Sequence, residues 1–188
     1  MKDNERIQIA FGTPMYIGRI DYDFKFPKKD FENNVLQLDL PHLEFKILDC
    51  CKEIVKEVGF VEQPMKVNEL WLNKYDKNRT HIPMHYHQNC SWTGTYYPKQ
   101  ATHLVQFANP NSGFQNQYLP EVKYSTDFNS DYLSFHDMQE GMVIIHPSWI
   151  AHAVYWDSNC EPSYSISFDI AYTGEIGNKN YGSYNDGK

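Results

Sequence analysis

Apolar residues along this chain follow two different periods. In one segment they recur every three or four positions, at Ile47, Cys51, Ile54, Val55 and Val58. This spacing predicts an amphipathic helix of about 15 residues that ends at Gly59, because one face of a helix repeats about every 3.6 residues. Residues 30–38 carry a weaker helical pattern. Both helices are expected to support the outside of a sheet.

Elsewhere apolar and polar residues alternate, which is the pattern of half-buried strands. The segments with this pattern are 7–11, 15–20, 67–75, 81–97, 101–107, 142–146, 149–156 and 163–172. Many short strands without helices between them favour a β-sandwich or barrel. We expect one domain over residues 1–172, with helical support at about 28–58 and a β core at about 65–172. The tail, residues 173–188, is rich in Gly, Asn and Tyr and is expected to fray.

The segment from Asn109 to about Tyr132 differs from its neighbours. It is polar and aromatic and has no period. A stretch of this length inside a small domain is usually a functional loop. We therefore expect it to be a lid over a site.

Composition narrows the class of protein. The 188 residues carry a formal net charge of -7, which argues against binding to nucleic acid or to anionic lipid. No apolar run approaches the roughly 18 residues of a membrane span, and the first residues lack a hydrophobic signal region, so we expect a cytoplasmic protein. The four cysteines form no CxxC pair and are expected to be reduced thiols.

Histidines supply the strongest sign of chemistry. His85 and His87 lie two positions apart, so both point to one face of a strand. If that strand is uninterrupted, the same face carries a polar row suited to a wet cavity, formed by Asn89, Ser91, Thr93, Thr95 and Tyr97. His152 lies on a later strand, and His146 is expected at a rim. Two imidazoles on one face can hold a metal ion when a third ligand joins them. The alternative is that these histidines cluster by chance, but the polar row and His152 favour a metal site.

Three stretches around these histidines have a distinctive order and spacing. The first is His85-x-His87-x-Asn89 with Thr93-Gly94-Thr95-Tyr96-Tyr97 and Phe107-Ala108-Asn109-Pro110. The others are Gly141 with His146-Pro147-Ser148-Trp149-Ile150-x-His152-x-Val154, and Ser165-Ile166-Ser167-Phe168-Asp169. Together they resemble the HxH…SGVYY…F.DP, G…FPSWLxHxV and SISFN patterns of a family of 2-oxoglutarate/Fe(II)-dependent oxygenases from bacteria and marine phages. The resemblance runs from about Trp71 to Ile170. It implies a mainly β fold, a double-stranded β-helix (a cupin-like jelly-roll) with iron in its mouth.

The resemblance also implies a set of metal ligands. His85 and His152 correspond to the two histidine ligands of Fe(II). The usual third ligand of this superfamily is a carboxylate two residues after the first histidine, but His87 stands there. His87 therefore completes a three-histidine site, leaves its position to water, or does not bind the metal. We favour the three-histidine site, because a neutral imidazole changes the charge and redox tuning of iron without excluding oxygen chemistry.

The cosubstrate implied by the resemblance is 2-oxoglutarate, and its binding residues are less regular. The superfamily usually binds the distal carboxylate with an Arg two residues before a Ser on the last strand. Ser163 occupies that position, and residues 124–178 contain no Lys or Arg. A buried carboxylate needs a cation; Lys99, which shares the parity of His85, is the first candidate and Arg79 the second. The residues expected to contact 2-oxoglutarate are Lys99, Tyr97, Ser165, Asn73 and Thr95.

The expected activity is hydroxylation of an unidentified substrate by a non-haem Fe(II)- and 2-oxoglutarate-dependent dioxygenase. One alternative is a three-histidine cupin-type dioxygenase that does not use 2-oxoglutarate, which His87 and Ser163 favour. Another is a jelly-roll module with a binding or structural role and no catalysis. A zinc hydrolase fits less well, since no carboxylate lies beside the histidine pair to act as base. The sequence identifies neither the substrate, a small molecule or a protein, nor the oligomeric state; a phage-encoded chain would act in the host cytoplasm.

Overall fold

The computed structural model describes residues 6–10, 12–113, 117, 121, 123, 126 and 129–174. In chain order its elements are β1 (Arg6–Ala10), β2 (Thr13–Arg19), β3 (Val35–Gln37), α1 (Pro41–Glu57), β4 (Met65–Tyr75), β5 (His81–His85), β6 (Trp92–Tyr96), β7 (Leu104–Ala108), β8 (Tyr132–Phe135), β9 (Met142–Pro147), β10 (His152–Tyr155) and β11 (Ser163–Tyr172). Among the described helices, none is long and apolar enough to cross a membrane.

The strands form two antiparallel sheets. The larger has the order β1-β2-β9-β6-β11-β4-β3, and the smaller has the order β5-β10-β7-β8. From β4 to β11 the chain passes back and forth between the two sheets, so that β4, β6, β9 and β11 lie in one and β5, β7, β8 and β10 in the other. This winding is a double-stranded β-helix, or jelly-roll. The expected fold class is confirmed.

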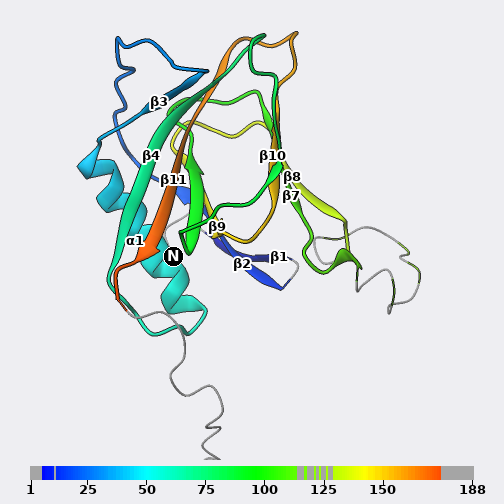
Figure 1. The fold of residues 1–188 in the computed structure, drawn as a ribbon. Helices are drawn as coiled ribbons and strands as arrows, with labels where there is room; N and C mark the ends of the chain where they lie inside the picture. The colour runs from blue at the N-terminus through cyan, green and yellow to red at the C-terminus, as the bar shows by residue number, and fades with distance from the viewer. Residues whose placement is uncertain are drawn as a thin grey trace, which may run out of the picture.

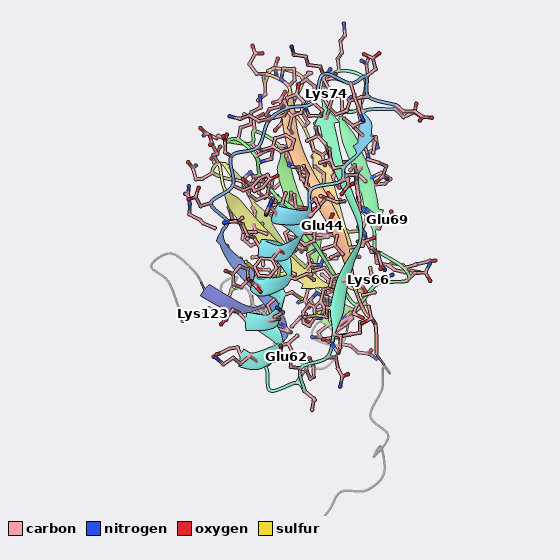
Figure 2. The ribbon with its side chains drawn as sticks, turned by 90° about the vertical axis from the view of Figure 1, so that its left-hand side faces the viewer. Glu44, Glu62, Lys66, Glu69, Lys74 and Lys123 are labelled. Atoms are coloured by element: carbon pink, nitrogen blue, oxygen red, sulfur yellow. The ribbon has the colours of Figure 1, made fainter. Side chains whose placement is uncertain are left out.

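Helix α1 covers the outer face of the large sheet, on the side away from β7, β8 and β10 (Figure 1). Pro41 begins it, at a position where the missing N–H of proline breaks no helical hydrogen bond. The expected end at Gly59 is confirmed: Val58 caps the helix, and Gly59 has φ +75°, a conformation that suits glycine. Its buried face consists of Leu43, Ile47, Cys50, Cys51, Ile54 and Val55. Figure 2 views the sheet from this side, with Lys66 and Lys74 toward opposite ends of β4.

The strands of the large sheet present different chemistry on their two faces. On β11, Ile166, Phe168 and Ile170 belong to the core under α1. The residues that alternate with them, Ser165, Ser167 and Asp169, line a cavity between the two sheets. A strand alternates its side chains, so one sequence serves an apolar core and a polar cavity at once.

The weaker helix expected at residues 30–38 is wrong. Residues Val35–Gln37 form β3, which pairs with β4 at the edge of the large sheet. Asn33 and Asn34 precede it with φ values of 50° and 65°, and Glu32 bridges Val35 across this turn. Two consecutive left-handed residues end any helix, and asparagine tolerates that conformation better than most residues.

Other expected boundaries have mixed outcomes. The strand expected at 149–156 is shorter, because Ser148 to Ile150 form a turn before β10. Eleven of the 24 residues of the expected lid at 109–132 lie outside the described residues, as do residues 175–188 of the expected tail. The extent of the domain, residues 1–172, stays a prediction.

Gly94 in β6 lies where the sheet and its core approach most closely. A Cβ placed there would meet the carbonyl oxygen of Ile144 and would lie 2.6 Å from Cζ of Phe168. The backbone of Ile144 and the core around Phe168 leave no room for that methyl group.

We predict that Gly94→Ala lowers the free energy of unfolding by about 1–3 kcal/mol, the usual range for overpacking a core. Urea denaturation followed by circular dichroism measures it. Gly113→Ala is the matched control, because nothing lies within 4 Å of its added Cβ. Equal stability of the two variants would contradict the close approach at Gly94.

Candidate metal and cosubstrate site

A cavity of about 330 Å³ lies between the two sheets. Side chains from β4, β6, β9 and β11 line one wall, and side chains from β5, β7 and β10 line the other. Its volume falls within the range of small-molecule pockets, roughly 300–1,000 Å³. The cavity therefore suits a small ligand held between the sheets.

Three histidines converge in this cavity from two strands and a loop. His85 ends β5, His87 follows it, and His152 begins β10, directly opposite His85 in the sheet. One ring nitrogen of each lies within 4.8 Å of one ring nitrogen of the other two. The ring centroids of His85 and His152 are 4.4 Å apart, and those of His87 and His152 are 5.2 Å apart. The structure thus brings together the three residues expected to hold iron.

Each of the three imidazoles is oriented by a hydrogen bond at Nδ1. The acceptors are the carbonyl oxygen of Pro83 for His85 at 2.8 Å, a carboxylate oxygen of Asp169 for His87 at 2.7 Å, and the carbonyl oxygen of Ile150 for His152 at 3.3 Å. Carbonyl and carboxylate oxygens only accept, so Nδ1 carries the proton in each ring. Nε2 is then the atom with a free lone pair, which is how metal-binding histidines are commonly held.

Burial keeps two of these rings, those of His85 and His152, in the form that binds a metal. It lowers the pKa of His85, and the neighbouring charges of His87 and Arg79 lower it further. Burial also lowers the pKa of His152 well below its usual value, with the nearby histidines adding to the effect. Both imidazoles are therefore neutral at pH 7, with their lone pairs available.

A carboxylate stands behind the third histidine instead of replacing it. Asp169 on β11 accepts the Nδ1–H of His87, and both side chains are mostly buried. Cys90 also comes within 4.8 Å of His87 and Asp169, so these three form a second possible metal group. Burial and the charge of Asp169 raise the pKa of Cys90 to about 12, which keeps it a thiol and a poor ligand. The three-histidine group is the better metal site.

His146 on β9 adds a fourth imidazole next to the three. It was expected at a rim, but the structure buries it, with an exposed fraction of 3%. Its ring lies 4.9 Å from that of His152, edge to face, and Nδ1 donates to the carbonyl oxygen of Pro147. The rim expectation failed because β9 continues through Pro147 inside the sheet instead of turning at it.

The opposite end of the cavity is closed and rich in hydroxyl groups. Tyr75 and Tyr97, with exposed fractions of 1% and 0%, line it together with His103. The hydroxyls of Tyr75 and Ser165 lie 3.2 Å apart. We call this part of the cavity, lined by Tyr75, Tyr97, His103 and Ser165, the buried end.

Arg79 brings a positive charge to the cavity. Its Nη1 donates to Oδ1 of Asn73 at 3.1 Å, and its guanidinium lies 5.9 Å from the ring centroid of Tyr75. Among the described residues no carboxylate forms a salt bridge with it, and Arg79 is one of the residues that line the cavity.

The expected contacts of 2-oxoglutarate are brought together except for one. Asn73, Thr95, Tyr97 and Ser165 all line the cavity. Lys99 does not: its ammonium lies 4.5 Å from the ring centroid of Tyr164, whose side chain projects from the opposite face of β11. The reason is the turn at residues 98–99, which takes the chain out of β6 and ends its parity.

The expected polar row is likewise interrupted. Thr95 and Tyr97 line the cavity, and Thr93 is buried on the same strand as Thr95. Asn89 and Ser91 do not line it. Between β5 and β6 the chain crosses from one sheet to the other, and Asn89 takes φ +60° in that crossing. Residues before and after this crossing meet at the cavity because the two sheets face each other, not because one strand continues through it.

A larger groove of about 1240 Å³ lies between α1 and the β2 side of the sheet. Its charged lining contains both signs, and two of its members, Lys52 and Asp49, pair with each other at 3.0 Å. It does not contain the histidine group. The smaller cavity between the sheets is therefore the candidate site.

Comparison with known families identifies the domain. Residues 69–169, more than half of the 188-residue chain, match the family described as "Putative 2OG-Fe(II) oxygenase". The chain belongs to this family. The expected family is thereby confirmed, and its description as an oxygenase that uses Fe(II) and 2-oxoglutarate agrees with the expected enzyme class and cofactors. No curated protein matches the sequence significantly.

Solved structures give distant likenesses. The chain is similar to EvdMO1, with 15% identity and a TM-score of 0.47 over 69% of this chain and 32% of that one. It is similar to AviO1 from Streptomyces viridochromogenes Tue57, with 14% identity and a TM-score of 0.49 over 85% and 77% of the two chains. It is also similar to HygX from Streptomyces hygroscopicus, solved with nickel and 2-oxoglutarate bound, with 13% identity and a TM-score of 0.47 over 80% and 72%. The chain thus spans about a third of the length of EvdMO1.

The side chains of the cavity fit the metal that this family uses. Three imidazoles whose ring nitrogens lie within 4.8 Å of one another form a donor set that suits iron and other first-row metals. Asp169 and His146 had not been selected from the sequence as parts of the site. Asp169 has the parity of Ser165 and Ser167 on β11, so the alternation of that strand is the signal that identifies it.

Buried neutral histidines give the metal-free protein a pH-dependent stability. Burial lowers the pKa of His103 and of His146 to about 3. In the unfolded chain each has a pKa of about 6.5, so below that pH the unfolded state binds protons that the folded state does not. Stability is complete above pH 6.5 and falls as the pH drops toward 3.

We predict that, as the pH falls from 6 to 4, each of these two histidines contributes a decrease in the free energy of unfolding of about 1.4 kcal/mol per pH unit. Urea titrations of metal-free protein across this range measure the slope. His146→Gln removes one titrating group and flattens the slope, whereas the control His81→Gln, at an exposed position, leaves it unchanged. A slope that His146→Gln does not alter would contradict the neutral, buried state of His146.

Proposed function

We propose that this protein is a non-haem Fe(II)- and 2-oxoglutarate-dependent dioxygenase that hydroxylates a C–H bond of a substrate still to be identified. The observation that carries the proposal is the convergence of ring nitrogens of His85, His87 and His152 in the same cavity as Arg79. Family membership supplies the class of chemistry, and the cavity supplies a metal site and a cation for an anionic cosubstrate.

The residues divide into two tasks. His85, His87 and His152 would hold the iron, and Asp169 fixes the tautomer of His87 and places a negative charge one hydrogen bond behind it. That charge offsets part of what is lost when an imidazole stands in place of a carboxylate ligand. When bound, iron and 2-oxoglutarate supply the oxidant: O2 and 2-oxoglutarate are converted with the substrate C–H group to succinate, CO2 and the alcohol.

Arg79 is the residue we propose to neutralise 2-oxoglutarate. A dicarboxylate inside a cavity needs a cation, because a buried unpaired carboxylate costs several kcal/mol. Asn73 holds the guanidinium through Nη1, and itself donates to Ser167 at 2.9 Å. Thr95, Tyr97 and Ser165 would add polar contacts from the neighbouring strands.

A second candidate function is a three-histidine metal dioxygenase that does not use 2-oxoglutarate. It is favoured by Ser163, which stands where the superfamily usually has an Arg, and by His87 in place of a carboxylate ligand. The proposed function and this alternative differ in one measurement. Iron-dependent O2 uptake that does not respond to added 2-oxoglutarate would favour the alternative.

We predict that protein loaded with Fe(II) without O2 releases succinate from 2-oxoglutarate when O2 is admitted. His85→Ala and His152→Ala are expected to abolish both iron retention and succinate release, because two imidazoles do not hold Fe(II) tightly. His87→Asp restores a carboxylate and is expected to retain iron. The matched control His81→Ala, on the same strand but exposed, is expected to behave as wild type. Iron retention by His85→Ala equal to wild type would contradict the metal site.

We predict that Arg79→Gln weakens 2-oxoglutarate binding by about 10- to 100-fold, the effect of losing a hydrogen bond to a charged group. Lys99→Gln removes the same charge elsewhere and is expected to change binding less than about twofold, because Lys99 lies over Tyr164 on the far side of β11. The KM for 2-oxoglutarate in succinate release measures both. A larger effect of Lys99→Gln than of Arg79→Gln on this KM would contradict the role of Arg79 and indicate that Lys99 binds 2-oxoglutarate.

A further inference from the structure

Two polar atoms at the buried end have no hydrogen-bond partner among the residues that the structure describes. They are the hydroxyl of Tyr97 and Nε2 of His103, each on a side chain that is at most 1% exposed. The His103 ring lies 4.4 Å from the ring of Tyr75 and 5.7 Å from that of Tyr97. Buried polar atoms almost always have hydrogen-bond partners. Two unpaired polar atoms at one end of a cavity therefore indicate that a polar ligand forms hydrogen bonds with them.

The proton of His103 is placed by its neighbours. Nδ1 lies 2.8 Å from Oγ of Ser163, and the same Oγ accepts the backbone N–H of Thr102 at 3.0 Å. Ser163 is 1% exposed, so its own O–H must also find an acceptor, and Nδ1 is the one within reach. Nδ1 therefore accepts, and Nε2 carries the hydrogen. Burial also lowers the pKa of His103 to about 3, so the ring is neutral.

The buried end thus offers two aimed donors. Nε2–H of His103 is one, and the hydroxyl of Tyr97 is the other, since burial raises the pKa of Tyr97 and keeps its proton in place. Two neutral donors with a cation nearby are a suitable surrounding for a carboxylate, which only accepts hydrogen bonds. Arg79 lines the same cavity and supplies the charge.

We propose that His103, held by Ser163, is a specificity-determining residue that selects 2-oxo acids with a second carboxylate. His103 and Tyr97 donate to the carboxylate at the far end of the cosubstrate, and Ser163 sets the tautomer that makes His103 a donor. This rests on the proposed use of 2-oxoglutarate. Ser163, at the start of β11, thus positions a histidine that lies directly before β7.

The test compares two ligands of equal chain length. 2-Oxoglutarate and 2-oxopentanoate share the 2-oxo acid group and five carbons, but only 2-oxoglutarate has a far carboxylate. Calorimetric titration of the Ni(II)-loaded protein under argon measures both affinities without turnover. Wild type is expected to bind 2-oxoglutarate more tightly than 2-oxopentanoate. His103→Phe is expected to weaken the affinity for 2-oxoglutarate by about 10- to 100-fold and to change the affinity for 2-oxopentanoate by less than about threefold.

Three further variants separate a binding role from a structural one. Ser163→Ala removes one hydroxyl and is expected to lower the ratio of the two affinities in the same direction as His103→Phe. His103→Gln keeps an N–H donor and is expected to restore part of the preference. His136→Phe, an exposed histidine outside the cavity, is the matched control and keeps the wild-type ratio.

The outcomes distinguish the two proposals. No binding of 2-oxoglutarate to wild type would overturn the proposed function, and the inference with it. A wild-type preference for 2-oxoglutarate that survives in both His103→Phe and Ser163→Ala would overturn only the role of His103. If His103→Phe does not fold, as thermal unfolding would reveal, the ratios of Ser163→Ala and His103→Gln decide in the same way.

Discussion

Everything in this structure depends on the alternation of side chains across the central strands of the large sheet. Each of these strands sends apolar residues toward α1 and mostly polar ones into the cavity, as Phe168 and Ser167 do on β11. A slip of one residue would exchange the two sets, placing serines in the core and phenylalanine in the cavity. The cost of that exchange sets the register of β4, β6 and β11, and so the position of every group in the site.

The cavity joins two requirements that usually conflict. A metal ligand must keep a free lone pair, and a buried polar group must have its hydrogen bonds satisfied. The histidines meet both, because Nδ1 donates to the protein and Nε2 is left for the metal. Charge is distributed in a similar way: Asp169 lies behind the ligand His87, and Arg79 is held by Asn73 at the cavity wall.

Local patterns predicted much of this arrangement. The helix and its end at Gly59, the run of strands, and the convergence of His85, His87 and His152 agree with the structure. Two of the failures, Lys99 and the polar row after His87, share a cause, since both extrapolated a local period through a turn or a crossing between the sheets. Parity carried past Tyr97 placed Lys99 in the cavity, whereas the turn at residues 98–99 takes it to the other face of β11.

The sequence by itself determined which side chains alternate, where the helix ends, and which histidines share a face, because these follow from the periods of strands and helices and from the left-handed preference of glycine. Only the tertiary structure decided which residues meet. Arg79 follows β4, His103 precedes β7, and Asp169 lies on β11, and none is near the others in the chain. They surround one cavity because antiparallel pairing and the facing of two sheets bring distant segments together. No local sequence pattern shows which distant segments will meet.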